Sequence, residues 1–172
     1  MDARLRRKEI LTIINAAQVP VSASTLAKKF DISRQVVVGD VALLRAKGHD
    51  IIATARGYMM PQLRDDNHYM GKMACCHAPQ LTRDELYAIV DLNASVINVI
   101  VEHEVYGEIT GQLNLKSRED VNLFMDKVEQ SEIKLLSELT NGVHLHTIGC
   151  RDKAHFEHVY ERLKRAGYLL EE

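Results

Sequence analysis

The sequence predicts an α+β protein in two domains: three short helices with a two-stranded ribbon, followed by a sheet covered by helices. Apolar residues recur at helical spacing over residues 4–48, and shorter β-branched segments alternate with helical ones from residue 69 onward. The charge divides at the same place, because residues 1–60 carry ten Lys/Arg against five Asp/Glu and residues 61–172 carry 12 against 19. A basic first domain suits contact with phosphate, although chance could also produce this asymmetry.

Length and composition exclude several classes of protein. The chain has 172 residues, enough for one or two domains with hydrophobic cores. The sequence has no run of 18 apolar residues and no signal-peptide pattern, so we expect no membrane association and no secretion. Three cysteines, an odd number, do not indicate a disulfide framework, and we expect a cytoplasmic protein.

The first domain is expected to contain three helices, at residues 4–17, 23–30 and 33–48. Apolar residues at i, i+3, i+4 and i+7 give the first two helices one buried face each. Ser22 and Ser33 are placed to cap the second and third helices, and Gly48 ends the third.

Two short strands, residues 50–54 and 58–60, are expected to flank the turn Ala55-Arg56-Gly57. Three helices followed by such a ribbon form a winged helix-turn-helix, which we assign to residues 1–60. The polar segment 61–67 begins with a proline and is expected to be a linker, so that residues 68–172 form the second domain.

The third helix has the features of a DNA-recognition helix, with Val37, Val41 and Leu44 as its apolar stripe. Arg and Gln near the start of such a helix reach base edges, and a valine can contact a thymine methyl group. The candidate DNA-binding residues are Ser33, Arg34, Gln35, Val38, Arg45 and, at the ribbon tip, Arg56.

The basic residues at positions 4, 6, 7 and 8 are expected to add sequence-independent affinity for DNA. The alternative is a packed helix with a solvated charged face. Gly39 is unexpected in the middle of this helix, where glycine costs about 0.8–1 kcal/mol relative to alanine.

The second domain alternates strands and helices. We expect strands at residues 69–76, 95–101, 108–115 and 143–148, with Gly149 ending the last. Thr82, Ser117 and Asp152 are expected to begin three helices, the first through a capping box with Glu85. This order indicates helices packed on one face of a sheet.

Histidines are concentrated in the second domain, and His144 and His146 lie two residues apart on a strand, so their side chains share one face. His77 closes an earlier strand and Glu85 lies on the following helix. Three imidazoles and a carboxylate suit Zn, Ni or Fe(II) rather than Ca or Mg. The alternative is an ordinary polar surface.

The cysteines and the histidines of the last helix are not expected to bind this metal. Cys75 and Cys76 fit a buried strand end better than a ligand pair, and the sequence assigns no role to Cys150. His155 and His158 are expected at the surface of the last helix.

Both halves resemble a known bacterial family. The first resembles the winged helix of the biotin-repressor type, through SRQ followed by DVALLRAKG. The second resembles the 3H domain, through CCHAPQLTRDELYAIVD, VIVEHEVYGEITGQL and NGVHLHTIGC. The combination is that of the niacin-responsive transcriptional repressors of NAD biosynthesis and salvage genes.

The resemblance implies one divalent transition metal per subunit (Ni, Zn or Fe), held by His77, Glu85, His144 and His146. It implies nicotinic acid as co-repressor, with His103 and Tyr106 of the VEHEVYG turn as our candidate effector-binding residues. It also implies a homodimer on double-stranded operator DNA, palindromic, with recognition helices about 34 Å apart. Gly39 departs from the family, which usually has a polar residue there.

Two further functions remain open from the sequence. A metal with an open coordination position could activate water in a hydrolase, but no second carboxylate or nucleophile is placed by spacing to act as base. We therefore expect no enzyme. A metal-stabilised regulator could also respond to another small molecule, or to redox state through Cys75, Cys76 and Cys150.

Overall fold

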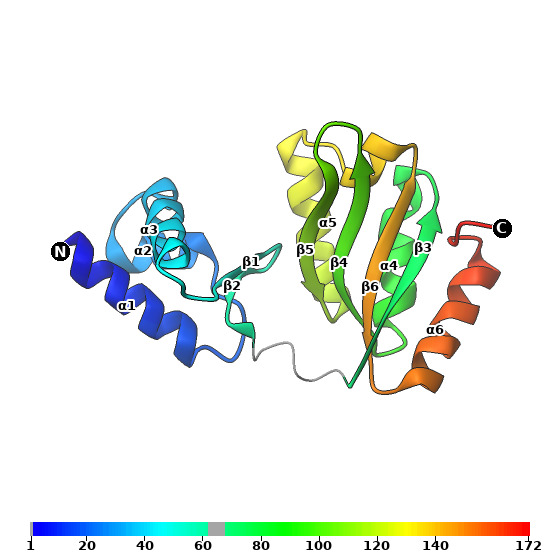
Figure 1. Ribbon diagram of the computed structural model, residues 1–172, viewed down its shortest axis with the longest axis horizontal. Coiled ribbons are helices and arrows are strands. Elements are labelled where there is room, and N and C mark those ends of the chain that lie inside the picture. The colour runs from blue at the N-terminus through cyan, green and yellow to red at the C-terminus, as the bar shows by residue number, and fades with distance from the viewer. Residues whose placement is uncertain (1, 62–67) are drawn as a thin grey trace. The chain divides into compact units, whose positions relative to one another are not determined.

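The chain divides into two units, Met1–Asp65 and Asp66–Glu172. A computed structural model describes residues 2–61 and 68–172, so residues 62–67 of the expected linker lie outside the described residues. The helices and strands of both units are labelled in Figure 1. Within the described residues, none of the helices combines the length and apolar character needed to cross a bilayer.

The first unit contains the expected three helices and ribbon: α1 (Ala3–Ala16), α2 (Ala23–Phe30), α3 (Arg34–Ala46), β1 (Ile52–Thr54) and β2 (Gly57–Met59). Ser22 and Ser33 cap α2 and α3 as predicted, accepting hydrogen bonds from the amides of Thr25 and Val36. Its core is built from apolar residues of all three helices and the ribbon, among them Ile10, Ile14, Leu26, Val37, Val41, Leu44 and Tyr58.

A third segment, which the sequence did not predict, pairs with the ribbon. Val21, between α1 and α2, exchanges two backbone hydrogen bonds of 2.8 Å with Tyr58 of β2. A Cβ atom at Gly57 would lie 2.6 Å from the Val21 carbonyl carbon, and its φ is +134°. Only glycine fits this position, because the backbone approaches closely and the conformation is unfavourable for L side chains.

Two of the basic residues expected to contact DNA form ion pairs within the first unit. Asp40 is buried on the inner side of α3, where its carboxylate accepts from Arg6 Nε at 2.6 Å and Arg7 Nη1 at 3.2 Å. A buried carboxylate needs such partners to offset its lost hydration. These ion pairs fasten α1 to α3. The affinity for phosphate that we expect from Arg6 and Arg7 stays a prediction.

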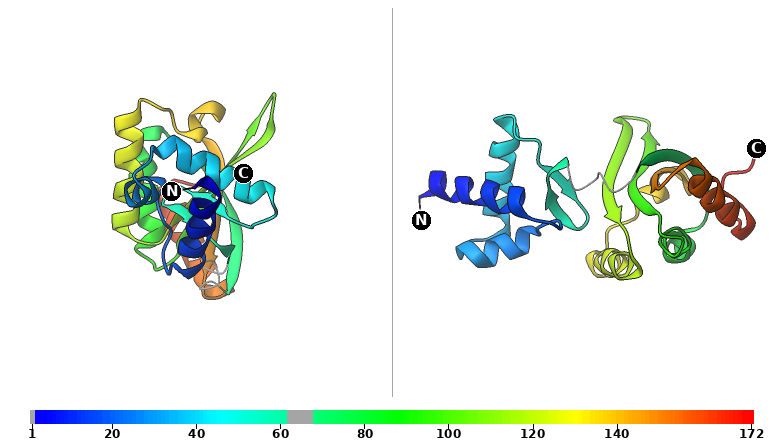
Figure 2. Two further views of the ribbon diagram at one scale, coloured as in Figure 1. Left: turned by 90° about the vertical axis from the view of Figure 1, so that its left-hand side faces the viewer. Right: turned by 90° about the horizontal axis from the view of Figure 1, so that it is seen from below.

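The second unit is a four-stranded antiparallel sheet with helices on one face (Figures 1 and 2). Its strands are β3 (Tyr69–Cys76), β4 (Ser95–His103), β5 (Gly107–Leu115) and β6 (Val143–Cys150), in the order β3-β6-β4-β5. The α-helices are α4 (Thr82–Val90), α5 (Arg118–Ser131) and α6 (Lys153–Ala166), and the 3₁₀ helices are η2 (Pro79–Leu81) and η3 (Leu136–Thr140). The last strand in the chain thus lies in the middle of the sheet.

The outer edge of β3 is covered by the C-terminal segment. Cys76 donates its amide to the carbonyl of Tyr168, and Leu170 donates to the carbonyl of Ala74, both at 2.9 Å. Covering an edge in this way satisfies its backbone groups and blocks pairing with another chain.

Three local predictions in this unit were wrong. Thr82 lies inside α4 and makes no capping hydrogen bond, because η2 leads directly into the helix. Gly149 does not end β6, because it pairs with Met70 and Ser95 and the strand continues to Cys150. His155 is buried, with Nε2 hydrogen-bonded to the Leu92 carbonyl at 2.7 Å, whereas His158 is exposed as expected.

Replacing Gly39 by alanine is expected to stabilise the first unit. A Cβ atom there meets no described heavy atom within 4 Å, and the residue lies inside α3. The gain should be about 0.8–1 kcal/mol, seen as a higher urea midpoint by circular dichroism of the full-length protein. Gly57→Ala is the matched control and should lower the midpoint. A destabilised Gly39→Ala variant would contradict this account of α3.

Candidate metal centre

The four residues expected to hold a metal come from three separate segments. His77 follows the end of β3, Glu85 lies in the first turns of α4, and His144 and His146 lie on β6. All four are buried, and the Glu85 side chain is fully inaccessible to solvent. The structure brings them together between the sheet and α4, around the Glu85 carboxylate.

The three imidazoles direct the same ring atom at Glu85. His77 Nε2 lies 2.6 Å from Glu85 Oε2, while His144 Nε2 and His146 Nε2 each lie 3.1 Å from Glu85 Oε1. One carboxylate is therefore surrounded by three ring nitrogens within a space closed to water.

The opposite nitrogen of each ring contacts a backbone carbonyl. Nδ1 lies 3.0 Å from the Ala78 oxygen in His77, 2.8 Å from the Gly142 oxygen in His144 and 2.7 Å from the Asn98 oxygen in His146. A carbonyl oxygen only accepts, so each Nδ1 must carry the proton and donate it. In the neutral imidazole, each Nε2 then presents a lone pair.

Three lone pairs facing a carboxylate require a positive charge between them. Although His77 Nε2 and Glu85 Oε2 are 2.6 Å apart, neither forms a hydrogen bond of acceptable geometry with any described residue. Protonating all three rings would place three positive charges beside one negative charge in a buried space, which is costly. A divalent cation supplies the charge with a single atom, so the residues fit a metal.

Electrostatics favour an ionised Glu85. Burial opposes its ionisation, but the three surrounding imidazoles outweigh this effect and hold the pKa of Glu85 well below its ordinary value. For His77 and His146, burial is again the largest opposing effect, and the Glu85 carboxylate outweighs it and raises the pKa of both. Protons and a metal ion therefore compete for the same nitrogens.

A β-bulge positions His146. The register of β4 shifts between Val96 and Asn98 in its pairing with β6. The Asn98 side-chain oxygen accepts from the Thr147 amide at 3.1 Å, and the Asn98 carbonyl accepts from His146. The extra residue thus aims a carbonyl at the imidazole, as bulges near functional sites often do.

Gly142 allows the two strand ends to meet. Its φ is +91°, and a Cβ atom would lie 2.5 Å from the carbonyl oxygen of His77. Its own carbonyl orients His144. Glycine is required here because it brings the segment that carries His77 against the entry to β6.

Cys75, which we expected at a buried strand end or in a redox response, is a further candidate donor. Cys75 Sγ, a Glu85 carboxylate oxygen and a His144 nitrogen all lie within 4.8 Å of one another, a compact set that does not include His77 or His146. One signal was present in the sequence, because Cys75 lies two residues before His77 at the end of a predicted strand, and alternate residues of a strand share a face.

The expected effector residues lie apart from these contacts, in the β4–β5 turn. His103 Nδ1 accepts from the amides of Val105 and Tyr106 at 3.1 and 3.3 Å, and the His103 and Tyr106 rings are 5.3 Å apart. A pocket of about 510 Å³ lies instead beside His77, with Lys134 and Glu138 among its lining residues.

Most of the DNA-binding candidates of α3 are exposed to solvent. Ser33 caps α3, while Arg34, Gln35 and Arg45 are exposed. Val38 is half-buried, and the large apolar side chains exposed on α3 are Val36 and Leu43, at 40% and 50%. Val38 is screened because it lies at the edge of the buried stripe, one residue after Val37.

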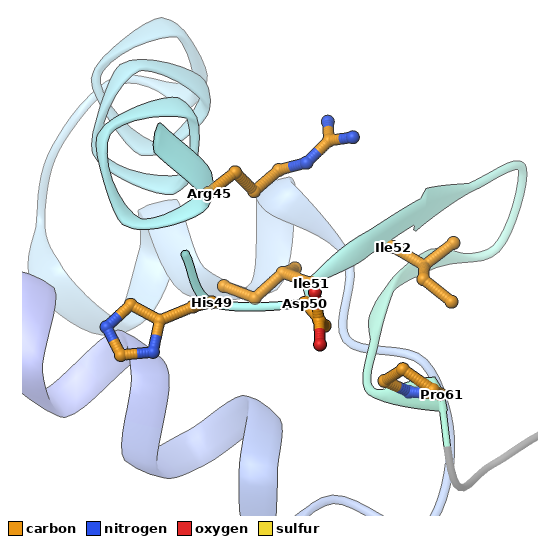
Figure 3. A pocket seen from close by; sticks show the side chains of 6 residues that line it. All are labelled: Arg45, His49, Asp50, Ile51, Ile52 and Pro61. Carbon is orange, nitrogen blue, oxygen red and sulfur yellow. The ribbon is translucent and has the colours of Figure 1, made fainter. Parts of the chain in front are cut away.

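Two other basic residues border the ribbon. Arg45 extends away from the end of α3 at the edge of a pocket of about 550 Å³ that His49, Asp50 and Ile52 also line (Figure 3). Arg56 lies in the ribbon turn, where its amide donates to the Thr54 hydroxyl. Arg45 thus lies in the last turn of the recognition helix, and Arg56 lies on the wing.

Replacing His144 or His146 by alanine should remove the metal, because each loses an Nε2 donor whose orientation is fixed. Elemental analysis of purified full-length protein is expected to show stoichiometric metal in the parent and strongly reduced metal in each variant. His158→Ala is the control, since this exposed histidine of α6 should not affect metal content. Full occupancy in both His144→Ala and His146→Ala would place the metal elsewhere.

Comparisons with known proteins agree with this two-part architecture. Residues 6–59 match a family model described as an HTH domain, and residues 70–172 match the 3H domain. The chain is 37% identical over 169 residues to the transcription repressor NadR of Bacillus subtilis, and 39% identical over 167 residues to the probable transcription repressor NiaR of Thermotoga maritima. Each alignment covers 97% of this chain and 94% of the relative. The chain belongs to the 3H-domain family of helix-turn-helix transcription repressors.

Proposed function

We propose that the protein is a DNA-binding transcription repressor of NAD-related genes, with nicotinic acid as its co-repressor and a divalent metal in its 3H domain as part of the sensor. The protein is a regulator and not an enzyme, in keeping with the relatives of Bacillus subtilis and Thermotoga maritima, which are named a transcription repressor and a probable transcription repressor. The main observation that supports a metal-containing sensor is the buried set of three imidazoles that point at Glu85.

Binding to operator DNA is supported by the first unit. Arg34 and Gln35 are exposed at the start of α3, where side chains of a recognition helix reach base edges in the major groove. One such helix reads only a half-site, so we propose a homodimer on a palindromic operator.

The metal proposal is supported by donor chemistry. His77, Glu85, His144 and His146 would hold the ion, and three imidazoles with a carboxylate suit Zn, Ni or Fe(II). When bound, such an ion supplies a Lewis-acidic centre that attracts nitrogen and carboxylate donors. Nicotinic acid carries both, as a pyridine nitrogen and a carboxylate.

The pocket beside His77 is a better-supported place for the effector than the β4–β5 turn. His77 lines it and also contacts Glu85, so the pocket adjoins the candidate metal centre. Lys134 supplies a cation suited to a carboxylate. Tyr106, in contrast, is 77% exposed on its turn.

A gel-shift titration tests the proposed function. Metal-loaded full-length protein should bind a palindromic operator, selected in vitro from random DNA, at least tenfold more tightly with nicotinic acid than without it. A ligand enhances binding only when it prefers the DNA-competent state, and a preference of 100-fold corresponds to about 2.7 kcal/mol per site. Equal affinity with and without the acid would exclude nicotinic acid as co-repressor.

Two variants locate the effector in the same assay. Lys134→Ala should weaken the response to nicotinic acid while leaving DNA binding without the acid unchanged. His103→Ala should retain the response if the pocket beside His77 is the site. The opposite pattern would favour the β4–β5 turn that we first expected.

Replacing Arg34 by alanine should reduce affinity for the selected operator by about 1–3 kcal/mol and relax preference at the base that it contacts. The measurement is a competition gel shift against operators altered at single positions. Arg165→Ala, in the last turn of α6, is the charge-matched control and should bind as the parent does. An Arg34→Ala variant with unchanged affinity and preference would remove α3 as the recognition element.

A further inference from the structure

Cys75 faces the candidate metal centre directly. It lies on β3 opposite His144 of β6 in the antiparallel register, so the two side chains emerge on the same face of the sheet. The Cys75 side chain is fully buried, and its thiol is not oxidised to a disulfide. Its nearest hydrogen-bond acceptor on the backbone is the Met73 carbonyl at 3.9 Å, which is a weak contact.

The sulfur lies among donors already assigned to the metal. Cys75 Sγ, a Glu85 carboxylate oxygen and a His144 nitrogen all lie within 4.8 Å of one another, so the sulfur is adjacent to two of the four assigned donors. A separate observation points to a ligand at this place, because Glu85 Oε2 and His77 Nε2 are buried and have no hydrogen-bond partner among the described residues.

We infer that Cys75 is a fifth protein donor to the metal, so that the centre combines three imidazole nitrogens, one carboxylate and one thiolate. This inference rests on the proposed metal centre and adds a ligand to it. On binding, the thiol S–H bond breaks, its proton leaves to solvent, and a sulfur lone pair forms the bond to the ion.

A bound metal ion would stabilise the thiolate form of Cys75 at this position. Burial, followed by the negative charge of Glu85 and a hydrogen bond to it, raises the pKa of the Cys75 thiol far above its ordinary value. A divalent cation between the two groups reverses this electrostatic effect. A thiolate also selects softer ions, so the site should prefer Zn, Ni, Co or Fe(II) over Mg or Mn.

The chain offers two matched controls. Cys76 is the next residue of the same strand, and its side chain points to the opposite face of the sheet. Cys150 is a buried free thiol at the far end of β6, paired with Tyr69 rather than with the histidine segment. Neither should bind the ion.

Cobalt and zinc are the probes. Full-length protein loaded with Co(II) should show a near-ultraviolet thiolate-to-cobalt charge-transfer band that Cys76→Ser and Cys150→Ser retain and Cys75→Ser loses. X-ray absorption of the Zn(II)-loaded parent should show one sulfur neighbour at about 2.3 Å. The zinc measurement needs no variant, so it stands even if Cys75→Ser does not fold.

Each of the other outcomes contradicts the inference, and each excludes a different part of the proposed centre. Stoichiometric metal without a charge-transfer band and without a sulfur neighbour would remove Cys75 from the centre and leave the four-residue site intact. A band that persists in Cys75→Ser would assign the sulfur to another cysteine. Failure of the parent to bind cobalt or zinc at all would remove the metal centre itself.

Discussion

Three hydrogen bonds from histidine Nδ1 atoms to backbone carbonyls are the constraint on which the candidate site depends. They fix both the tautomer and the orientation of His77, His144 and His146, so that each Nε2 lone pair faces Glu85. Metal-binding histidines generally have their second nitrogen held in this way. Because the acceptors are main-chain oxygens, the donor set depends on the fold rather than on other side chains.

The backbone features near the site follow from that requirement. The bulge in β4 turns the Asn98 carbonyl to His146, and Gly142 permits contact with the His77 backbone. The covered edge of β3 and the central place of β6 keep this assembly away from solvent. A buried carboxylate beside unpaired lone pairs disfavours the ion-free state, and the gain on metal binding can offset that cost.

The sequence predicted the elements and the four clustered residues better than it predicted their surroundings. Periodicity and caps locate α2, α3, β3 and α6 because they are local signals. The bulge in β4 and the pairing of Val21 with Tyr58 arise from contacts between distant residues, which no local pattern specifies. Cys75 was assigned to packing for the same reason, since its place opposite His144 depends on the strand register.

The most direct test of this account is nitrogen-15 NMR of the imidazole rings in full-length protein titrated with zinc. We expect His77, His144 and His146 to keep the proton on Nδ1 while each Nε2 takes the chemical shift of a metal-bound nitrogen, and we expect no change at the exposed His158. Protons on Nε2 of these three rings in the presence of stoichiometric zinc would contradict it.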